Sequence, residues 1–175
     1  LAQKLQAERP LTRKTFERYT TLMGRIPGVT LQAQVPPPGT TDGAAHMNIQ
    51  ASRKPFTSSM SMTDDSRGGL QALIAGTSNS HTSMGEQVSL SGLFPPGDDK
   101  EHYYRLDYSQ IINAEGTQLS LYGARYRSDP STHIRLDGGF SLKPHRENDR
   151  FSIGLSHPLI ASPSESLTLG TRFYG

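Results

Sequence analysis

The side chains that could do chemistry are few, and they lie in stretches where polar and apolar residues alternate. Ser156 stands next to His157, and these are the residue types of a nucleophile and its general base. Neighbouring residues of a strand point to opposite faces, so this pair is not expected to work together. The sequence contains no GxSxG elbow and no phosphate-binding glycine loop. We therefore predict that the protein is not an enzyme and has no catalytic residues.

Metal and cofactor sites are not predicted either. The six histidines are far apart in the sequence and make no ligand spacing such as HExxH. The acidic run at 98–101 lacks the pattern of a calcium-binding EF-hand and is interpreted as a solvated turn. We predict no metal, no cofactor and no small-molecule substrate.

Polar residues of one parity are the remaining candidates for function, because they would share one side of a ribbon. The candidate lumen-facing residues are Arg105, Asp107, Gln118, Ser120 and Arg172. Apolar residues such as Tyr104, Leu106 and Leu121 occupy the other parity. Two interpretations stay open: the polar residues line a substrate path, or they are the mutually paired side chains that any barrel interior needs.

The elements that would position these residues are strands. From residue 55 onward the readable segments alternate with a period of two, which is typical of strands with one apolar face. Seven strands are predicted, at 56–62, 70–76, 86–94, 103–111, 117–127, 150–159 and 166–175. Short turns alternate with longer charged connections, which predicts two different ends of the sheet, although the connection at 78–85 is longer than this rule allows. Segment 132–141 is either a strand extension or a loop.

Residues 1–54 have a different pattern, which predicts a helix followed by two strands. Five apolar residues recur at spacings of three and four, as on one face of an amphipathic helix. They are Phe16, Tyr19, Leu22, Met23 and Ile26. Thr12 is expected to cap this helix, and Pro27 with Gly28 to stop it. Alternation then predicts strands at 29–35 and 45–52, and residues 1–8 are interpreted as the end of another helix.

Composition limits the class of protein. Of 175 residues 33% are hydrophobic, and the mean hydropathy is -0.56. Taken alone these values indicate weak burial or partial disorder, but they do not exclude a barrel, because its lumen side is polar. The net charge of +2 comes from 18 basic and 16 acidic residues interleaved along the chain, so nucleic acid is not expected as a partner. The absence of cysteine excludes a disulfide scaffold. The chain starts in a helical pattern and stops in an alternating run, so we expect a piece of a longer polypeptide.

Two arrangements fit strands with one apolar face. In a soluble sandwich the apolar faces pack together, whereas in a membrane barrel they meet lipid. Aromatic residues are predicted to gather at the far ends of the strands, like the girdle at a membrane interface. They are Phe94, Tyr103, Tyr104, Tyr126, Phe151, Phe173 and Tyr174. This placement favours the barrel.

Four motifs follow one another along the chain: Ile26-Pro27-Gly28-Val29 after a helix, the proline- and glycine-rich loop at 36–43, the glycine turn at 113–116, and the hairpin residues Gly154, Leu155, Pro158 and Leu159. In this order they resemble the outer-membrane transporters of two-partner secretion, the hemolysin activator and filamentous haemagglutinin transporter family. The resemblance implies an α+β POTRA remnant at 1–54, followed at 55–175 by the N-terminal antiparallel up-and-down transmembrane strands of a β-barrel. About seven strands would make a partial barrel.

The resemblance also implies a function and a location. The family belongs to type V secretion of Gram-negative bacteria, in which periplasmic POTRA domains capture an unfolded exoprotein and the barrel passes it to the cell surface. The expected partners are a TpsA-like secreted exoprotein and outer-membrane lipid. The strand at Val29, Thr30, Leu31, Gln32, Ala33, Gln34 and Val35 is the candidate partner-binding strand. An outer-membrane barrel assembly factor and a soluble β-rich binding module are the alternatives.

Overall fold

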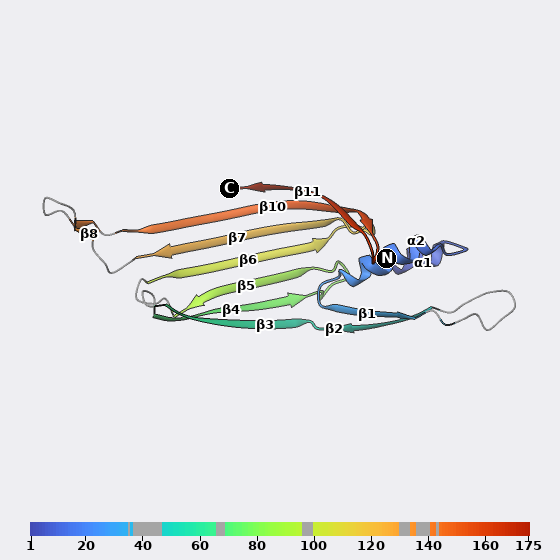
Figure 1. Ribbon diagram of the computed structural model, residues 1–175, viewed down its shortest axis with the longest axis horizontal. Helices are drawn as coiled ribbons and strands as arrows, with labels where there is room; N and C mark the ends of the chain where they lie inside the picture. The colour runs from blue at the N-terminus through green and yellow to red at the C-terminus, as the bar shows by residue number, and fades with distance from the viewer. Residues whose placement is uncertain are drawn as a thin grey trace.

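The protein consists of two short helices, a hairpin and a long curved sheet (Figure 1). The computed structural model describes residues 1–34, 36, 47–65, 69–95, 100–129, 134–135, 141–142 and 144–175. The helices are α1 Ala2–Ala7 and α2 Arg13–Gly24. The strands are β1 Val29–Gln34, β2 Asn48–Arg53, β3 Phe56–Asp65, β4 Gly69–Asn79, β5 Gln87–Phe94, β6 His102–Ile111, β7 Gln118–Ser128, β8 Ile134–Arg135, β9 Ser141–Leu142, β10 Arg146–Ala161 and β11 Ser166–Tyr174.

Helix α2 forms where the apolar spacing predicts it. The Thr12 side chain accepts a hydrogen bond from the backbone N–H of Thr15, which satisfies one of the free donors of the first turn. Tyr19, Leu22 and Met23 are buried on one face. The helix ends at Gly24, so the prediction that Ile26 belongs to its last turn is wrong. Among the described residues, neither helix has the length and apolar character needed to cross a membrane.

Strands β1 and β2 make an antiparallel hairpin whose apolar side packs on the helices. Leu31, Met47 and Ile49 are partly buried against a small core. The buried hydrophobic residues of that core are Leu5, Tyr19, Leu22, Met23 and Ala161. Because Ala161 belongs to β10, the N-terminal unit (residues 1–54) and the end of the long sheet share one core.

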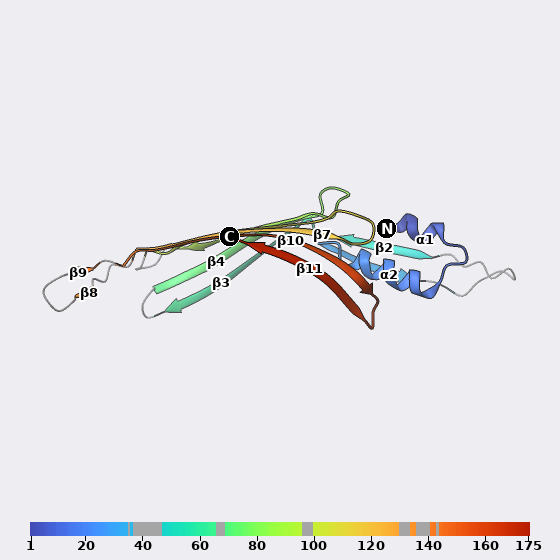
Figure 2. The ribbon, with the colours of Figure 1, turned by 90° about the horizontal axis from the view of Figure 1, so that it is seen from above.

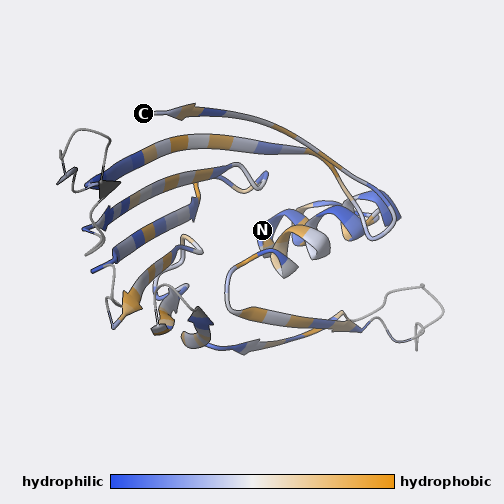
Figure 3. Ribbon diagram, turned by 60° about the vertical axis from the view of Figure 1, so that its left-hand side comes forward, coloured by the Kyte–Doolittle hydropathy of each residue, from blue (hydrophilic) through white to orange (hydrophobic). Residues whose placement is uncertain are grey.

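The long sheet is antiparallel and has seven strands in the order β11-β10-β7-β6-β5-β4-β3. Each strand pairs with the next along the chain, apart from β8 and β9, which form a separate small pair between β7 and β10. The sheet curves but does not close, since β3 and β11 stay apart (Figure 3). Seven strands in up-and-down order confirm the strand prediction. In segment 132–141, the described residues are these short strand pieces, and the rest lies outside the described residues.

The two ends of the sheet differ, as the turn lengths predict. The connections that follow β4, β6 and β10 lie at the end near the helices (Figure 1). The turn after β6 is built by Asn113, whose side-chain oxygen accepts hydrogen bonds from the backbone N–H groups of Glu115 and Thr117, both at 3.0 Å. Strands β3, β5 and β7 end at the opposite side of the sheet (Figure 1). The seven-residue connection 80–86 is the exception to the short-turn rule, and its contacts explain its length below.

One face of the long sheet is apolar and exposed. Cross-strand register places the following large side chains on that face: Phe56, Met60, Met62, Leu70, Ile74, Val88, Leu90, Phe94, Tyr104, Leu106, Leu121, Phe151, Ile153, Leu155, Leu167, Leu169 and Phe173. Their exposed fractions run from 37% to 69%. Figure 3 shows the alternation behind this as bands of colour along the strands. In the described part of the chain, no second sheet packs on this face.

The aromatic residues predicted at the far ends of the strands are divided between the two faces of the sheet. Phe94, Tyr104, Phe151 and Phe173 are on that face. Tyr103 is next to Tyr104 in the strand and therefore takes the opposite face, where it pairs in register with Tyr126. Tyr174 follows Phe173 and is on the polar face for the same reason. Strand parity, rather than level along the strand, decides which rings share a surface.

Candidate functional site

The polar face of the sheet carries all five candidate lumen-facing residues. Asp107 pairs with Tyr122, and Ser109 pairs with Ser120, so the polar residues of β6 and β7 share one face. The row of Ser120 continues through Gly154 to Arg172 on β11. Arg105 is two residues from Asp107 in β6, and Gln118 is two residues from Ser120 in β7, so both belong to this face as well. Register therefore brings these residues to one surface, although their role there remains a prediction.

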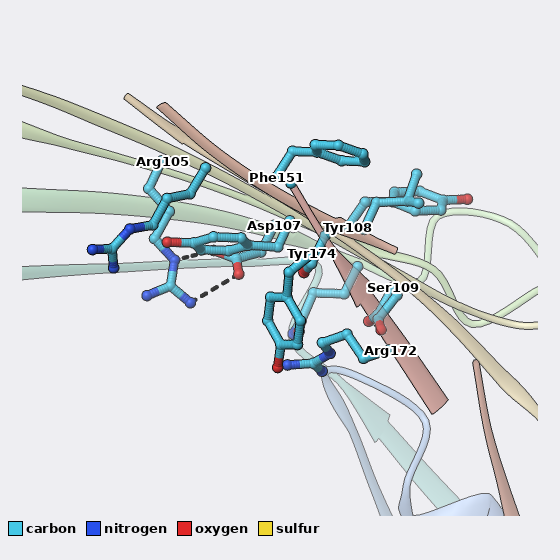
Figure 4. A pocket seen from close by; sticks show the side chains of 14 residues that line it. Arg105, Asp107, Tyr108, Ser109, Phe151, Arg172 and Tyr174 are labelled. Atoms are coloured by element: carbon cyan, nitrogen blue, oxygen red, sulfur yellow. Dashed lines mark hydrogen bonds and ion pairs between the residues drawn. The ribbon is translucent and has the colours of Figure 1, made fainter. Parts of the chain in front are cut away.

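A shallow hollow of about 750 Å³ lies on this polar face. It contains Arg105, Asp107, Ser120 and Arg172, whereas Gln118 lies outside it. Figure 4 shows Arg105, Asp107, Arg172 and Tyr174 on one side of the ribbons, with Phe151 and Tyr108 on the other. Most of the residues that line the hollow belong to the polar face, and Tyr108, Leu121 and Phe151 are lining residues of the opposite parity.

Arg105 and Asp107 form a closed pair inside the hollow. The guanidinium donates two hydrogen bonds to the carboxylate, from Nε to Oδ2 at 2.7 Å and from Nη2 to Oδ1 at 2.8 Å. The Cζ atom of Arg105 also lies 5.0 Å from the centroid of the Tyr122 ring, which is within cation–π range. Both oxygens of Asp107 are therefore used, and the pair adds no net charge to the surface.

Arg150 and Tyr174 are residues of the hollow that the candidate set left out. Arg150 pairs in register with Ala124, so it belongs to the same face as Arg105. Its Nε donates to Asn148 Oδ1 at 3.0 Å. The signal was present in the sequence, because Arg150 has the parity of Ser152, Gly154 and Ser156. It was missed because Arg150 stands at the first position of the predicted strand.

A second cluster joins helix α2 to the sheet. Tyr19 Oη donates to Glu115 Oε1 at 2.8 Å, and Arg18 Nη2 reaches Glu115 Oε2 at 3.4 Å. Arg18 also donates to the backbone carbonyls of Leu159 at 3.1 Å and Pro158 at 3.2 Å. The β10–β11 register shifts between Pro158 and Ile160, and such a bulge interrupts the ladder bonds. The carbonyls at the bulge are therefore free to accept from the helix.

The charge of Glu115 is stabilised by this cluster. The hydrogen bond from Tyr19 is the largest cause that lowers the pKa of Glu115, and contacts with Lys4 and Arg18 act in the same direction. Lys4 Nζ lies 3.4 Å from Glu115 Oε1. Burial, followed by the hydrogen bond to Glu115, raises the pKa of Tyr19. No local pattern predicts this cluster, because Tyr19 and Glu115 are far apart in the sequence.

The connection 80–86 makes the second attachment of the N-terminal unit. Ser80 Oγ donates to the Pro27 carbonyl at 2.6 Å. Asn79 Nδ2 donates to the Lys54 carbonyl at 3.2 Å, and Asn79 is only 2% exposed. The connection is closed on itself by Glu86, whose carboxylate accepts from Thr82 N–H at 2.7 Å and Thr82 Oγ1 at 2.6 Å. The longer connection therefore allows Ser80 to bind the turn that follows α2, at Pro27.

The candidate partner-binding strand is β1, and Val35 of that set lies outside the described residues. β1 pairs with β2 alone among the described strands, so its other edge has no strand partner there. Lys54 N–H donates to the Gly28 carbonyl at 2.7 Å, so Gly28 directs its backbone groups toward β2. Because partners alternate along an antiparallel pair, Gln32 points its N–H toward β2 and Leu31 points its N–H toward the open edge.

The structure places the residues that were considered for catalysis and for metal binding. Ser156 lies on the polar face opposite Gln118, and His157 makes a 2.8 Å hydrogen bond with Thr117 Oγ1 on the other face. This confirms that the two side chains point apart. Within the described residues, no group of three histidine, aspartate or glutamate side chains could hold a metal ion.

The fold has a counterpart among solved structures. No protein-family model and no curated protein matches the chain. The crystal structure of BamA from Haemophilus ducreyi lacking POTRA domains 1-3 matches it with a TM-score of 0.53 at 17% sequence identity. The match covers 94% of this chain and 30% of that one.

The sheet has the fold of part of the BamA barrel. At this identity the shared property is the fold. The chain spans about 30% of the length of the BamA structure that it matches, and the curved seven-stranded sheet with its short N-terminal helices is the region in common.

Proposed function

We propose that the protein is part of an outer-membrane translocator that captures an unfolded exoprotein in the periplasm and passes it through its barrel to the cell surface. In this proposal the polar face lines the channel and the apolar face meets lipid. The N-terminal unit is the end of a periplasmic POTRA domain. The chain belongs to the two-partner secretion family that its motifs resemble, and its partner is a TpsA-like protein.

The observation that carries the proposal is the exposed apolar face of the seven-stranded sheet. Soluble monomers rarely leave a continuous apolar surface of more than a few hundred Å² in water. Here large apolar side chains stay exposed across all seven strands. Lipid is the solvent in which such a face is stable, and a barrel is the arrangement that leaves no unpaired strand edges there. A soluble β-rich module is therefore the weaker candidate.

Capture uses the open edge of β1. An extended exoprotein segment adds to this edge as a further strand, with main-chain hydrogen bonds supplying affinity. The two attachments of the N-terminal unit, at Glu115 and at Ser80, hold this edge in a defined position at one end of the sheet. The captured segment is then delivered to the polar face.

Assembly of other barrels in the outer membrane is the second candidate. The observation that favours it is the fold shared with the BamA structure. A translocator and an assembly factor need the same sheet and the same N-terminal unit, so cellular behaviour has to separate them.

The experiment that tests the proposal is deletion of the complete gene in its host, followed by two measurements. A translocator predicts that the exoprotein encoded beside it disappears from the medium, while the amounts of other outer-membrane barrels stay normal. If those barrels are depleted instead, the protein is an assembly factor and the proposal is wrong. Migration of the complete protein as a heat-modifiable band in the outer-membrane fraction is expected in both cases. A compact monomer that is soluble without detergent would contradict both candidates.

A further inference from the structure

The hollow on the polar face has an excess of positive charge. Its charged residues are Arg105, Asp107, Arg150 and Arg172. Arg105 and Asp107 neutralise each other through two short hydrogen bonds. Arg150 and Arg172 remain, and neither makes an ion pair within the described part of the chain. The carboxylates nearest in sequence, Glu147 and Asp149, have the opposite parity and pair with arginines of the other face.

Both arginines are held so that their head groups stay available. Arg172 pairs in register with Gly154, which has no side chain to cover it. A Cβ added at Gly154 would lie 3.2 Å from Arg172 Nε and 2.7 Å from Ser120 Oγ, so the arginine lies over this glycine. Arg150 is exposed, and only its Nε is used, by Asn148. A guanidinium with free N–H groups is suited to a carboxylate, which it can bind through two parallel hydrogen bonds.

The spacing of the two arginines matches an extended peptide. Arg172 lies opposite Gly154, which is four residues along β10 from Arg150. Four residues of strand correspond to about 13 Å. An extended segment presents alternate side chains to the same side, so residues i and i+4 of a bound segment would reach both guanidinium groups. Tyr122, Ser152 and Tyr174 are aligned in one register row between them, and the two tyrosines supply ring surfaces beside the path.

We propose that this hollow binds an extended acidic polypeptide segment, with Arg150 and Arg172 as the ligands of carboxylates four residues apart. The inference rests on the proposed function, because it names the chemistry of the segment that passes along the polar face. Charge complementarity favours an acidic occupant. Among the described residues of the hollow, two guanidinium groups have no carboxylate partner, and the one carboxylate, that of Asp107, is paired with Arg105.

The test uses the complete protein in lipid nanodiscs and a fluorescent glycine-serine peptide of twelve residues with aspartate at positions i and i+4. The peptide is expected to bind about fivefold tighter than its asparagine counterpart, as for an exposed but well-placed ion pair. Arg150→Gln and Arg172→Gln should each weaken binding, and the double variant should bind both peptides equally. Arg127→Gln is the matched control, because Arg127 lies on the other face and pairs with Glu147.

Two further measurements separate the alternatives. A peptide with adjacent aspartates should bind more weakly than the i, i+4 peptide, since neighbours point to opposite sides. If spacing has no effect and inorganic phosphate competes equally with every peptide, the hollow is a general anion site and the inference is wrong. Equal binding of the aspartate and asparagine peptides would also overturn it. A protein that inserts, exports its partner and ignores aspartate would leave the proposed function standing and remove this inference alone.

Discussion

Tyr19 Oη donates a 2.8 Å hydrogen bond to Oε1 of Glu115, and so joins helix α2 to the turn between β6 and β7. Arg18 and Lys4 form salt bridges with the same carboxylate. Because Tyr19 is in the N-terminal unit and Glu115 is in a turn of the long sheet, this contact holds the two parts together (Figure 2 shows them from above).

Replacing Tyr19 by phenylalanine removes this hydrogen bond and keeps the ring. We expect the local stability of α2 to fall by about 1 kcal/mol, the usual net value of one hydrogen bond. The measurement is hydrogen exchange of the α2 amides in the complete protein, which should become about fivefold faster. Tyr122→Phe is a matched control on the polar face and should leave exchange in α2 unchanged.

Acidification should loosen the same contact. The pKa of Glu115 is lowered in the folded protein, chiefly by the Tyr19 hydrogen bond. A lowered pKa means that the stabilisation is complete above the usual value of 4.5 and is lost as the pH falls through the lower folded value. Exchange in α2, corrected for its intrinsic pH dependence, should therefore rise below about pH 4.5. Glu115→Gln should be less protected at neutral pH and should lack this step; a wild-type step that persists in Glu115→Gln would exclude Glu115 as its cause.

Gly116 tests how closely the helix approaches the turn. It has a φ of +83°, and an added Cβ would lie 2.7 Å from Leu22 Cδ2 and 3.1 Å from Pro158 Cγ. Gly116→Ala should therefore destabilise the junction by more than the roughly 1 kcal/mol of backbone strain alone. Gly24→Ala is the control, because nothing lies within 4 Å of its added Cβ and alanine favours the helix end. Equal thermal stability of the two variants would show that the helix does not depend on this close approach.

Proline substitutions in β1 separate capture from folding. Leu31→Pro removes an N–H that points to the open edge, whereas Gln32→Pro removes one that points to β2, opposite Gln50. We expect Leu31→Pro to impair export of the exoprotein while the hairpin keeps its protease resistance. Gln32→Pro should lose both. Normal export by Leu31→Pro would count against capture at this edge.

The sequence predicts the strands well because alternation is a local property: neighbouring residues of a strand point to opposite faces. Polar and apolar parity alone is enough to place Arg105, Asp107 and Arg172 on one face. The register between strands is not local, so the alignment of Arg150 with Arg105 through Ala124 comes from the structure. Tyr103 and Tyr104 lie at one level of β6 but on opposite faces, because neighbouring residues of a strand alternate.

The junction is the part that the sequence predicts least. Glu115 and Gly116 look like ordinary turn residues, and the role of the long connection at 80–86 depends on Pro27, which is distant in the chain. The apolar spacing of α2 predicts that Tyr19 and Leu22 are buried but not what they meet. Helix α2 ends at Gly24 although Ile26 continues the spacing, because the N–H groups of Arg25 and Ile26 bond to carbonyls three residues back, at Leu22 and Met23.

In the proposed barrel the apolar face meets lipid and the polar face meets water, so neighbouring residues of β7 should differ sharply in their access to water. The chain contains no cysteine, so Ser120→Cys and Leu121→Cys can each be the single thiol of these 175 residues, with any cysteine elsewhere in the complete protein replaced. In intact proteoliposomes, a charged water-soluble maleimide should label Ser120→Cys and leave Leu121→Cys unlabelled until detergent is added. A bilayer-restricted quencher should affect a fluorophore at Leu121→Cys alone. Equal labelling of both thiols by the water-soluble reagent would contradict the account.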